Sequence, residues 1–148
     1  MNNFRKIFIT FLSALILTVA NTSSSFAKVE GDTIVLGAAV SLTGKYSSNG
    51  VHTQNGYNLA VERINSMGGV KVKGKNYKFK IIYYDDESNS GRAAQLAERL
   101  IKQDGVQYML GPYSSGLTKA MAPVTEKYKI PMVEANGASR SLFTKGYK

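Results

Sequence analysis

Two adjacent hydroxyl side chains, Ser114 and Ser115, stand where a short apolar stretch gives way to a helical pattern. The stretch before them, Val106–Leu110, has the apolar character of a strand, and the residues after Gly116 repeat apolar side chains at helical spacing. The first turn of a helix carries backbone N–H groups that lack an intrahelical acceptor, and such groups attract anions. The two serines therefore predict a site for an anion such as a carboxylate. One of them would also cap the helix, which is compatible with this role.

A second group of polar loop residues follows the next expected strand, Ile130–Glu134. Asn136 and Gly137 would offer backbone carbonyls and an amide there, and Ser139 would add a hydroxyl. In an open parallel sheet, ligands bind beyond the carboxyl ends of the strands, where neighbouring loops meet. Three loops are therefore expected to form one site: Ser41–Gly50, Gly111–Gly116 and Ala135–Ser139.

Motifs for catalysis, metal binding and nucleotide binding are incomplete. His52 is the single histidine and cysteine is absent, so neither a zinc site nor another metal site is expected. A serine hydrolase would need His52 to reach Ser114 or Ser115, and the Gly-x-Ser-x-Gly turn that exposes such a nucleophile is missing. The segment Ala39–Tyr46 lacks the first glycine and the magnesium-binding hydroxyl of a P-loop. No cofactor is expected.

A pair of carboxylates, Asp85 and Asp86, ends another expected strand. Such acids could hold a ribose, but the chain has no Gly-x-Gly-x-x-Gly segment after its first strand to cradle a dinucleotide. The favoured expectation is that they cap the helix that follows near Gly91.

Strand-like and helix-like segments alternate along the chain, and this order positions the loops. Four strands are expected, at Thr33–Val40, Lys78–Tyr84, Val106–Leu110 and Ile130–Glu134, with helices at Val51–Met67, Gly91–Gln103 and after Gly116, and a hairpin at Val70–Lys80. The alternation implies right-handed crossovers and an α/β fold with a doubly wound, mostly parallel sheet. The first helix would face the core with Tyr57, Ala60, Val61, Ile64 and Met67. Pro123 should kink or break the third helix, and the fourth strand should form an exposed edge.

The N-terminal segment Met1–Ala27 reads as a cleaved signal peptide. Arg5 and Lys6 precede an apolar stretch, Ile7–Ala20, that is shorter than the roughly 20 residues of a membrane span. With no cysteine available for lipidation, we expect a soluble periplasmic protein that begins near Lys28. The formal charge of +9 sits largely on lysines of the expected hairpin, which favours a solvated face over a nucleic-acid surface.

Several short segments, taken in order, resemble a known pattern. The chain resembles the N-terminal lobe of type I periplasmic binding proteins, in the leucine/isoleucine/valine-binding branch of ABC-transporter receptors, over essentially all of Thr33–Lys148. The segments that carry the resemblance are Ile34–Ser41, Gly68-Gly69, Tyr84-Asp85-Asp86, Gly111-Pro112-Tyr113-Ser114-Ser115 and Lys145-Gly146-Tyr147. The resemblance implies a two-lobed protein that closes on an amino acid or similar solute and delivers it to an inner-membrane permease. Residues 28–148 would then be part of the first lobe, and the second lobe is absent.

The resemblance also implies roles for individual residues. The serine that binds the ligand carboxylate falls on Ser115, preceded at the same rim by Tyr113 and Ser114. The carbonyl that accepts from the ligand ammonium falls on Asn136, and the side chain that packs over the ligand falls on Asn49.

One departure from the family pattern affects the expected ligand. The threonine hydroxyl of the fourth-strand loop falls on Ala138, which has none, and Ser139 could replace it only if the loop shifts. Together with the polar Asn49, this favours a different amino acid, an amide or a urea-like solute over a branched-chain amino acid.

The sequence therefore predicts a non-enzymatic solute-binding protein of an ABC importer. Two alternatives remain open at this stage: a ligand-sensing receptor ectodomain of the same fold, and a secreted α/β hydrolase.

Overall fold

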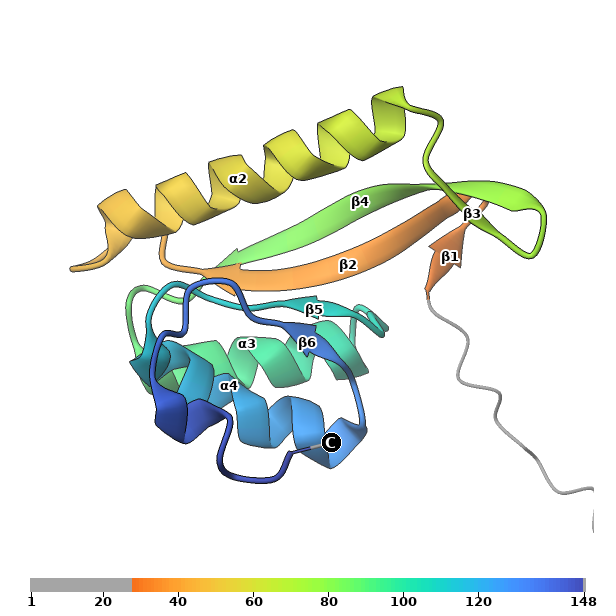
Figure 1. Ribbon diagram of the computed structural model, residues 1–148. Helices are drawn as coiled ribbons and strands as arrows, with labels where there is room; N and C mark the ends of the chain where they lie inside the picture. The colour runs from red at the N-terminus through yellow and green to blue at the C-terminus, as the bar shows by residue number, and fades with distance from the viewer. Residues whose placement is uncertain (1–27, 148) are drawn as a thin grey trace, which may run out of the picture.

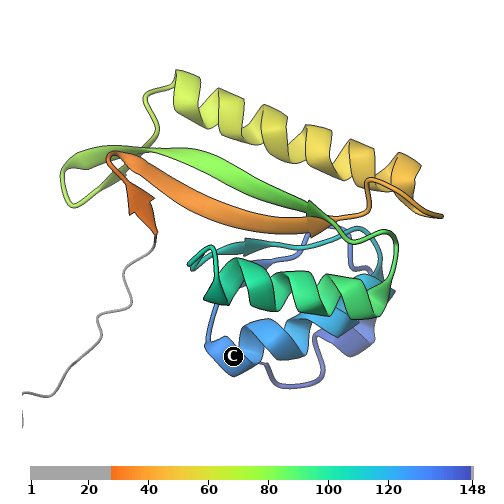
Figure 2. The same cartoon turned by 180° about the vertical axis from the view of Figure 1, so that it is seen from behind.

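The computed structural model describes residues 28–147, and these residues form three layers (Figure 1). Helix α2 (Ser47–Ser66) covers one face of a twisted sheet. Helices α3 (Ser90–Lys102) and α4 (Ser115–Tyr128) cover the opposite face, as the reverse view shows (Figure 2). The expected leader, Met1–Ala27, lies outside the described residues.

The centre of the sheet is β2 (Thr33–Val40), whose apolar side chains suit a strand covered on both faces. It runs parallel to β4 (Lys75–Asp85) on one side and to β5 (Met109–Leu110) on the other, and β6 (Met132–Val133) runs parallel to β5. The short strands β1 (Val29–Glu30) and β3 (Val70–Val72) are antiparallel to β2 and β4. The predicted doubly wound, mostly parallel sheet is confirmed, with β6 at its edge.

The predicted hairpin continues into the second main strand as one strand, β4, which pairs with β3 near its start and with β2 beyond it. Other predicted boundaries were wrong. The strands expected at Val106–Leu110 and Ile130–Glu134 shorten to two residues each, because only those residues find partners across the ladder. β1 was not predicted, since two residues are too few to show a pattern.

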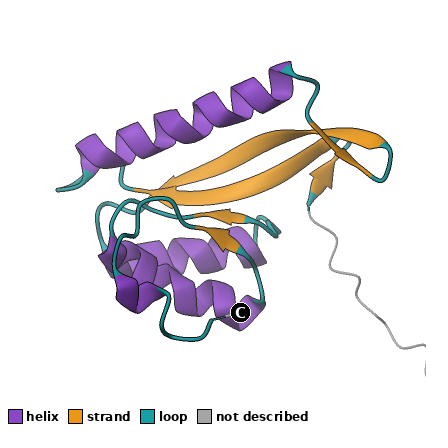
Figure 3. Ribbon diagram, viewed as in Figure 1, coloured by secondary structure: helices purple, strands orange, loops and turns teal. Residues whose placement is uncertain are grey.

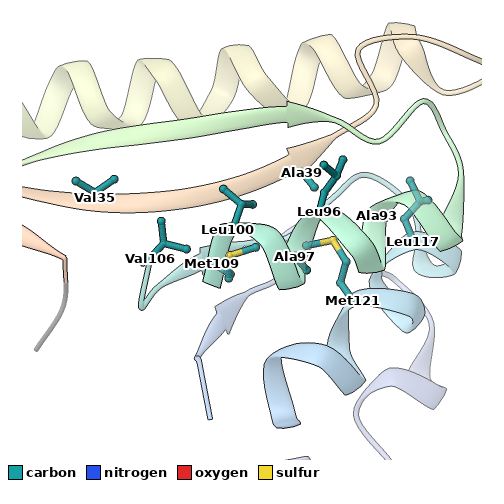
Figure 4. Close-up of a cluster of buried hydrophobic side chains, with 10 residues drawn as sticks. All are labelled: Val35, Ala39, Ala93, Leu96, Ala97, Leu100, Val106, Met109, Leu117 and Met121. Atoms are coloured by element: carbon teal, nitrogen blue, oxygen red, sulfur yellow. The ribbon is translucent and has the colours of Figure 1, made fainter. Parts of the chain in front are cut away.

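The hydrophobic core lies between the sheet and the pair α3 and α4 (Figures 3 and 4). The predicted stripe of α3 is buried at Ala93, Leu96, Ala97 and Leu100, and α4 adds Leu117 and Met121. α4 runs through Pro123 without interruption, so the proline does not break the helix. Proline has no N–H, so the carbonyl of Lys119 loses its hydrogen-bond donor within the helix. Lys119 and Pro123 are both exposed, and water can donate to this carbonyl instead.

Helix α2 is packed less deeply than the sequence predicted. Its buried residues are Gly50 and Thr53, whereas Ala60 is exposed and Met67, just past the helix end, is 66% exposed. The reason is that α2 lies by itself over β2 and β4 within residues 28–147, so the flanks of its apolar stripe meet no second helix. The helix also begins earlier than predicted, which places Asn49 in its first turn rather than in a loop. Among the described residues, no helix has the length and apolar character of a membrane span.

A close approach between α2 and the end of β2 depends on Gly50. A Cβ atom at this position would lie 1.9 Å from the carbonyl oxygen of Ser41. Gly56, in the same helix, has open space around its Cα. The first turn of α2 can therefore rest directly on the backbone that follows β2 only because residue 50 lacks a side chain.

These two glycines give a matched test of the packing. Gly50→Ala should lower the free energy of unfolding by about 3 kcal/mol, because backbone must move to relieve the contact. Gly56→Ala should raise it by about 0.5–1 kcal/mol, since alanine restricts the unfolded chain. Denaturant unfolding of both variants measures this. Equal effects of the two substitutions would contradict the packing described.

Candidate functional site

A cleft of about 520 Å³ opens between the N-terminal half of α2 and the loops that follow β5 and β6. These loops gather at the end of the sheet toward which β2 and β4 point (Figure 1). The cleft is lined by Asn49, His52, Thr53, Gly56, Tyr57, Tyr113, Ala135 and Asn136. Three residues predicted for the site, Asn49, Tyr113 and Asn136, are thus brought together. Ser114, Ser115, Gly137, Ala138 and Ser139 lie in the adjoining loops but do not line the cleft itself.

One face of α2 forms a wall of the cleft that the sequence analysis missed. Asn49, Thr53 and Tyr57 follow each other at four-residue spacing and so share this face. The sequence predicts Tyr57 as part of the core stripe, and it offers His52 only as a catalytic or metal-binding group. The signal was present, because the apolar stripe of this helix turns polar toward its N-terminus.

The hydroxyl of Tyr57 ties this wall to the loop after β5. It donates a hydrogen bond of 2.8 Å to the carbonyl oxygen of Gly111. Burial, helped by the negative charge of Glu134, raises the pKa of Tyr57 to about 12, so the phenol stays neutral at physiological pH. Across the cleft, the ring of Tyr113 rests edge-on against Tyr46, with 5.7 Å between ring centroids.

The opening turn of α4 carries unpaired backbone donors at the place where the sequence predicts an anion site. Ser114 is its N-cap and accepts from the amide of Leu117 at 3.4 Å, so the capping role is confirmed for this serine. Its φ of 82° is unusual for a residue with a side chain, and such strain is typical of functional turns. The amides of Ser115 and Gly116 have no hydrogen-bond partner within residues 28–147, and Gly116 is exposed.

The hydroxyl of Ser115 is held in place by the neighbouring loop. Its oxygen accepts a hydrogen bond of 3.0 Å from the amide of Ser139. A serine hydroxyl has one proton to donate in addition to its acceptor sites, so this contact leaves its donor capacity available. The bond also joins the two loops from which the sequence predicted a shared site.

The loop after β6 differs from the prediction at Gly137. Its amide does not face a ligand, because it donates to the side chain of Glu134, as the amide of Asn136 also does. Ala138 is exposed and carries no hydroxyl. The hydroxyl of Ser139 pairs with that of Ser141 at 2.8 Å.

The loop after β2 is fixed by the two carboxylates at the end of β4. Asp85 accepts from the amides of Leu42 and Thr43 and from the hydroxyl of Thr43 at 2.7 Å. Asp86, which is fully buried, accepts from the Ser41 hydroxyl at 2.6 Å. The expectation that this pair caps α3 was wrong. Asn89 caps that helix, because it lies directly before the first turn and accepts from the amide of Arg92.

The two neighbouring carboxylates are shifted in opposite directions. Burial raises the pKa of Asp86, and one of its oxygens has no hydrogen-bond partner among the residues described. Burial also acts on Asp85, but hydrogen bonds from Thr43, Glu87 and Leu42 outweigh it and hold the pKa of that carboxyl below its usual value. The fold therefore makes Asp86 easier to protonate and Asp85 harder to protonate than a free aspartate.

A second hollow, of about 370 Å³, lies between α4 and the short helix η1 (Arg140–Leu142). Its walls include Ala122, Ile130, Met132 and Phe143, and none of the serines of the α4 opening turn takes part. It is therefore separate from the candidate site. Within residues 28–147 there is no cluster of three or more residues that could hold a metal ion.

Comparison with known proteins assigns the family. Residues 33–147 match the profile of the periplasmic binding protein family. The Leucine-, isoleucine-, valine-, threonine-, and alanine-binding protein of Pseudomonas aeruginosa is 26% identical over 93% of this chain and 35% of its own length. The chain thus spans about a third of the length of such relatives.

Solved structures agree with this assignment. The isoleucine complex of the branched-chain amino acid transporter substrate-binding protein LivJ from Streptococcus pneumoniae superposes with a TM-score of 0.70, at 30% identity over 78% of this chain and 32% of that one. A solute-binding protein from Rhodopseudomonas palustris, in complex with 3,4-dihydroxybenzoic acid, gives a TM-score of 0.63 at 28% identity, over 75% of this chain and 29% of that one.

The fold is that of type I periplasmic binding proteins. The chain belongs to the periplasmic binding protein family, as the sequence predicted.

The carboxylate pair predicts opposite pH dependences. Because the pKa of Asp86 is raised in the fold, its contribution to stability is present at low pH and is lost as the pH rises from the unfolded value through the folded one. Asp86→Asn removes this loss, so the variant should gain stability relative to wild type as the pH rises above the unfolded value of about 3.9. The pKa of Asp85 is lowered, so the stability that it contributes is present above the unfolded value and is lost as the pH falls through the folded one. Asp85→Asn should therefore be less stable than wild type at neutral pH, and this difference should shrink as the pH falls below about 3.9.

Thermal unfolding from neutral pH down to below the unfolded pKa of aspartate, about 3.9, measures both effects. Parallel curves for the two variants would contradict the environments assigned to these carboxylates.

Proposed function

We propose that this chain is part of a substrate-binding protein that captures an amino acid or a related small solute for an ABC importer in the periplasm. The observation that carries the proposal is the opening turn of α4. There the unpaired amides of Ser115 and Gly116 and the Ser115 hydroxyl lie beside a cleft large enough for such a solute.

The donors at this turn suit a carboxylate. Helix N-termini favour negative charge, and hydrogen bonds to a charged group contribute about 1.5–3 kcal/mol each. The hydroxyl of Ser115 is oriented before a ligand arrives, because the Ser139 amide holds its oxygen. A ligand then loses less entropy in organising the site.

The cleft favours a ligand with polar groups in addition to its carboxylate. Asn49, His52 and Asn136 line it together with two tyrosines. The position that matches the family threonine is Ala138, and the neighbouring Ser139 hydroxyl is already paired. A polar amino acid, an amide or a urea-like solute suits these side chains better than a branched aliphatic one. The Rhodopseudomonas relative, solved with an aromatic acid, illustrates that ligands differ within the family.

We expect the protein to bind its solute without catalysing a reaction. His52 makes no hydrogen bond to Ser114 or Ser115 within residues 28–147, and Ser115 is engaged with Ser139. The partners would be the solute and an inner-membrane permease, with residues 1–27 serving as the signal peptide and a second lobe completing the site.

The test is affinity in the full-length protein. Ser115→Ala should weaken binding about tenfold or more, because it removes a hydrogen bond to the ligand carboxylate or, for an amide, to its carbonyl oxygen. Calorimetric titration with the five amino acids named for the Pseudomonas relative, and with L-glutamine and acetamide, provides the measurement. Ser66→Ala, an exposed serine at the end of α2, is the matched control. Equal affinities of wild type and Ser115→Ala would contradict the assignment.

A further inference from the structure

The carboxylate of Glu134 occupies an unusual place beside the candidate site. One of its oxygens accepts from two consecutive backbone amides, those of Asn136 and Gly137. The other accepts from the hydroxyl of Thr118 on α4 at 2.8 Å. The concave pair of amides could bind an anion, and here the protein's own side chain fills it. A ligand carboxylate therefore cannot use these two amides.

Two glycines make room for this carboxylate. A Cβ atom at Gly111 would lie 2.2 Å from a carboxylate oxygen of Glu134, and one at Gly137 would lie 3.1 Å from its carboxyl carbon. The side chain is thus seated between the loops after β5 and β6, where it contacts both. Its position is built into the packing of the rim.

The two hydrogen bonds from the Asn136 and Gly137 amides to Glu134 fix the direction of the carbonyl groups in this loop. All peptide bonds of residues 28–147 are trans, so each carbonyl points opposite to the N–H of the same peptide unit. The carbonyls of Ala135 and Asn136 therefore point away from Glu134. These are the two residues of the loop that line the cleft.

The charge of Glu134 is not neutralised by a neighbouring cation. Within the part of the chain that the structure describes, no lysine, arginine or histidine forms an ion pair with it. Its negative potential nevertheless reaches the cleft, because it contributes to the raised pKa of Tyr57 in the cleft wall. The Asn136 end of the cleft therefore combines carbonyl oxygens with a nearby negative charge.

We propose that Glu134 is a positioning residue that directs the Asn136 carbonyl into the cleft and makes this end of the site select a cationic group over a neutral one. The inference rests on the proposed function, and it names the ligand as one with an ammonium or similar cation at the end opposite its carboxylate donors. A second carboxylate at that end is excluded. Glu134 itself lies behind the loop and does not touch the ligand.

Glu134→Gln separates charge from geometry. The glutamine oxygen can accept from both amides, and its NH₂ group can donate to Thr118, whose hydroxyl then donates to the carbonyl of Ser114, 2.9 Å away. The loop keeps its hydrogen bonds while the negative charge is removed. Glu134→Ala removes the charge and these hydrogen bonds together. Glu62→Gln, at an exposed position further along α2, makes the same chemical change away from the cleft.

The experiment compares each amino acid with its α-hydroxy acid, in which a neutral hydroxyl replaces the ammonium group. Calorimetry on full-length protein would use L-leucine, L-isoleucine, L-valine, L-threonine and L-alanine, each with its hydroxy counterpart. Wild type should prefer the amino acid, and Glu134→Gln should reduce this preference about tenfold, the order expected for one partly buried charge acting over several ångströms. Glu62→Gln should leave it unchanged, and Glu134→Gln should unfold near the wild-type temperature.

The possible outcomes separate this inference from the proposed function. Amino-acid binding with the same preference in wild type and in Glu134→Gln would overturn the role of Glu134 and leave solute capture intact. Ser115→Ala should weaken both members of a pair without changing their ratio, because both carry the carboxylate. Binding of acetamide alone by wild type would overturn this inference and leave solute capture intact. Binding by wild type of none of these pairs, and of neither L-glutamine nor acetamide, would overturn the proposed function and this inference with it.

Discussion

The amides at the start of an α-helix cannot be paired within their own helix, and the candidate site depends on where one such set is placed. In this fold, β5 ends after two residues and the chain turns through Ser114 into α4, so the free amides of Ser115 and Gly116 appear at the rim of the sheet. The parallel arrangement of β2, β5 and β6 brings the other loops to the same edge. The topology thus supplies unsatisfied donors and the walls around them.

Each loop at this rim is fixed by a polar contact between segments that are distant along the chain. Asp85 holds the amides after β2, Ser115 holds the amide of Ser139, and Tyr57 holds the carbonyl of Gly111. Glu134 adds a contact within the loop after β6. A loop held in this way is ordered before a ligand binds, and less binding free energy is then lost to ordering. The hydrophobic core on the far side of the sheet supports the strands from which these loops emerge.

Much of the fold could be predicted because its signals are local. The continuous apolar residues of β2 and the three- and four-residue spacing of apolar residues in α3 identify a strand and a helix without knowledge of the tertiary structure. Ser114 and Ser115 could be placed at a helix start for the same reason. The boundaries of β5 and β6 could not be predicted, since a two-residue strand is defined by its partner across the ladder rather than by its own sequence.

The parts of the site that escaped prediction depend on contacts between distant residues. Asp85 and Asp86 appear suited to cap the next helix, but the free amides and hydroxyls of the loop after β2 lie closer to them. The role of Glu134 becomes visible only when its loop folds back on it. Tyr57 has the spacing of a core residue, and it faces the cleft because α2 alone covers its side of the sheet within the described residues.

The most direct measurement of the central claim is a ¹H–¹⁵N NMR titration of the full-length protein with L-isoleucine, the ligand of the pneumococcal relative, and with L-glutamine and L-threonine as polar alternatives. If the free amides at the α4 opening turn bind a carboxylate, the Ser115 and Gly116 resonances should move downfield with the ligand that binds. The amides of Asn136 and Gly137 should keep their hydrogen bonds and shift less. A ligand that binds without moving the Ser115 and Gly116 resonances would contradict the account.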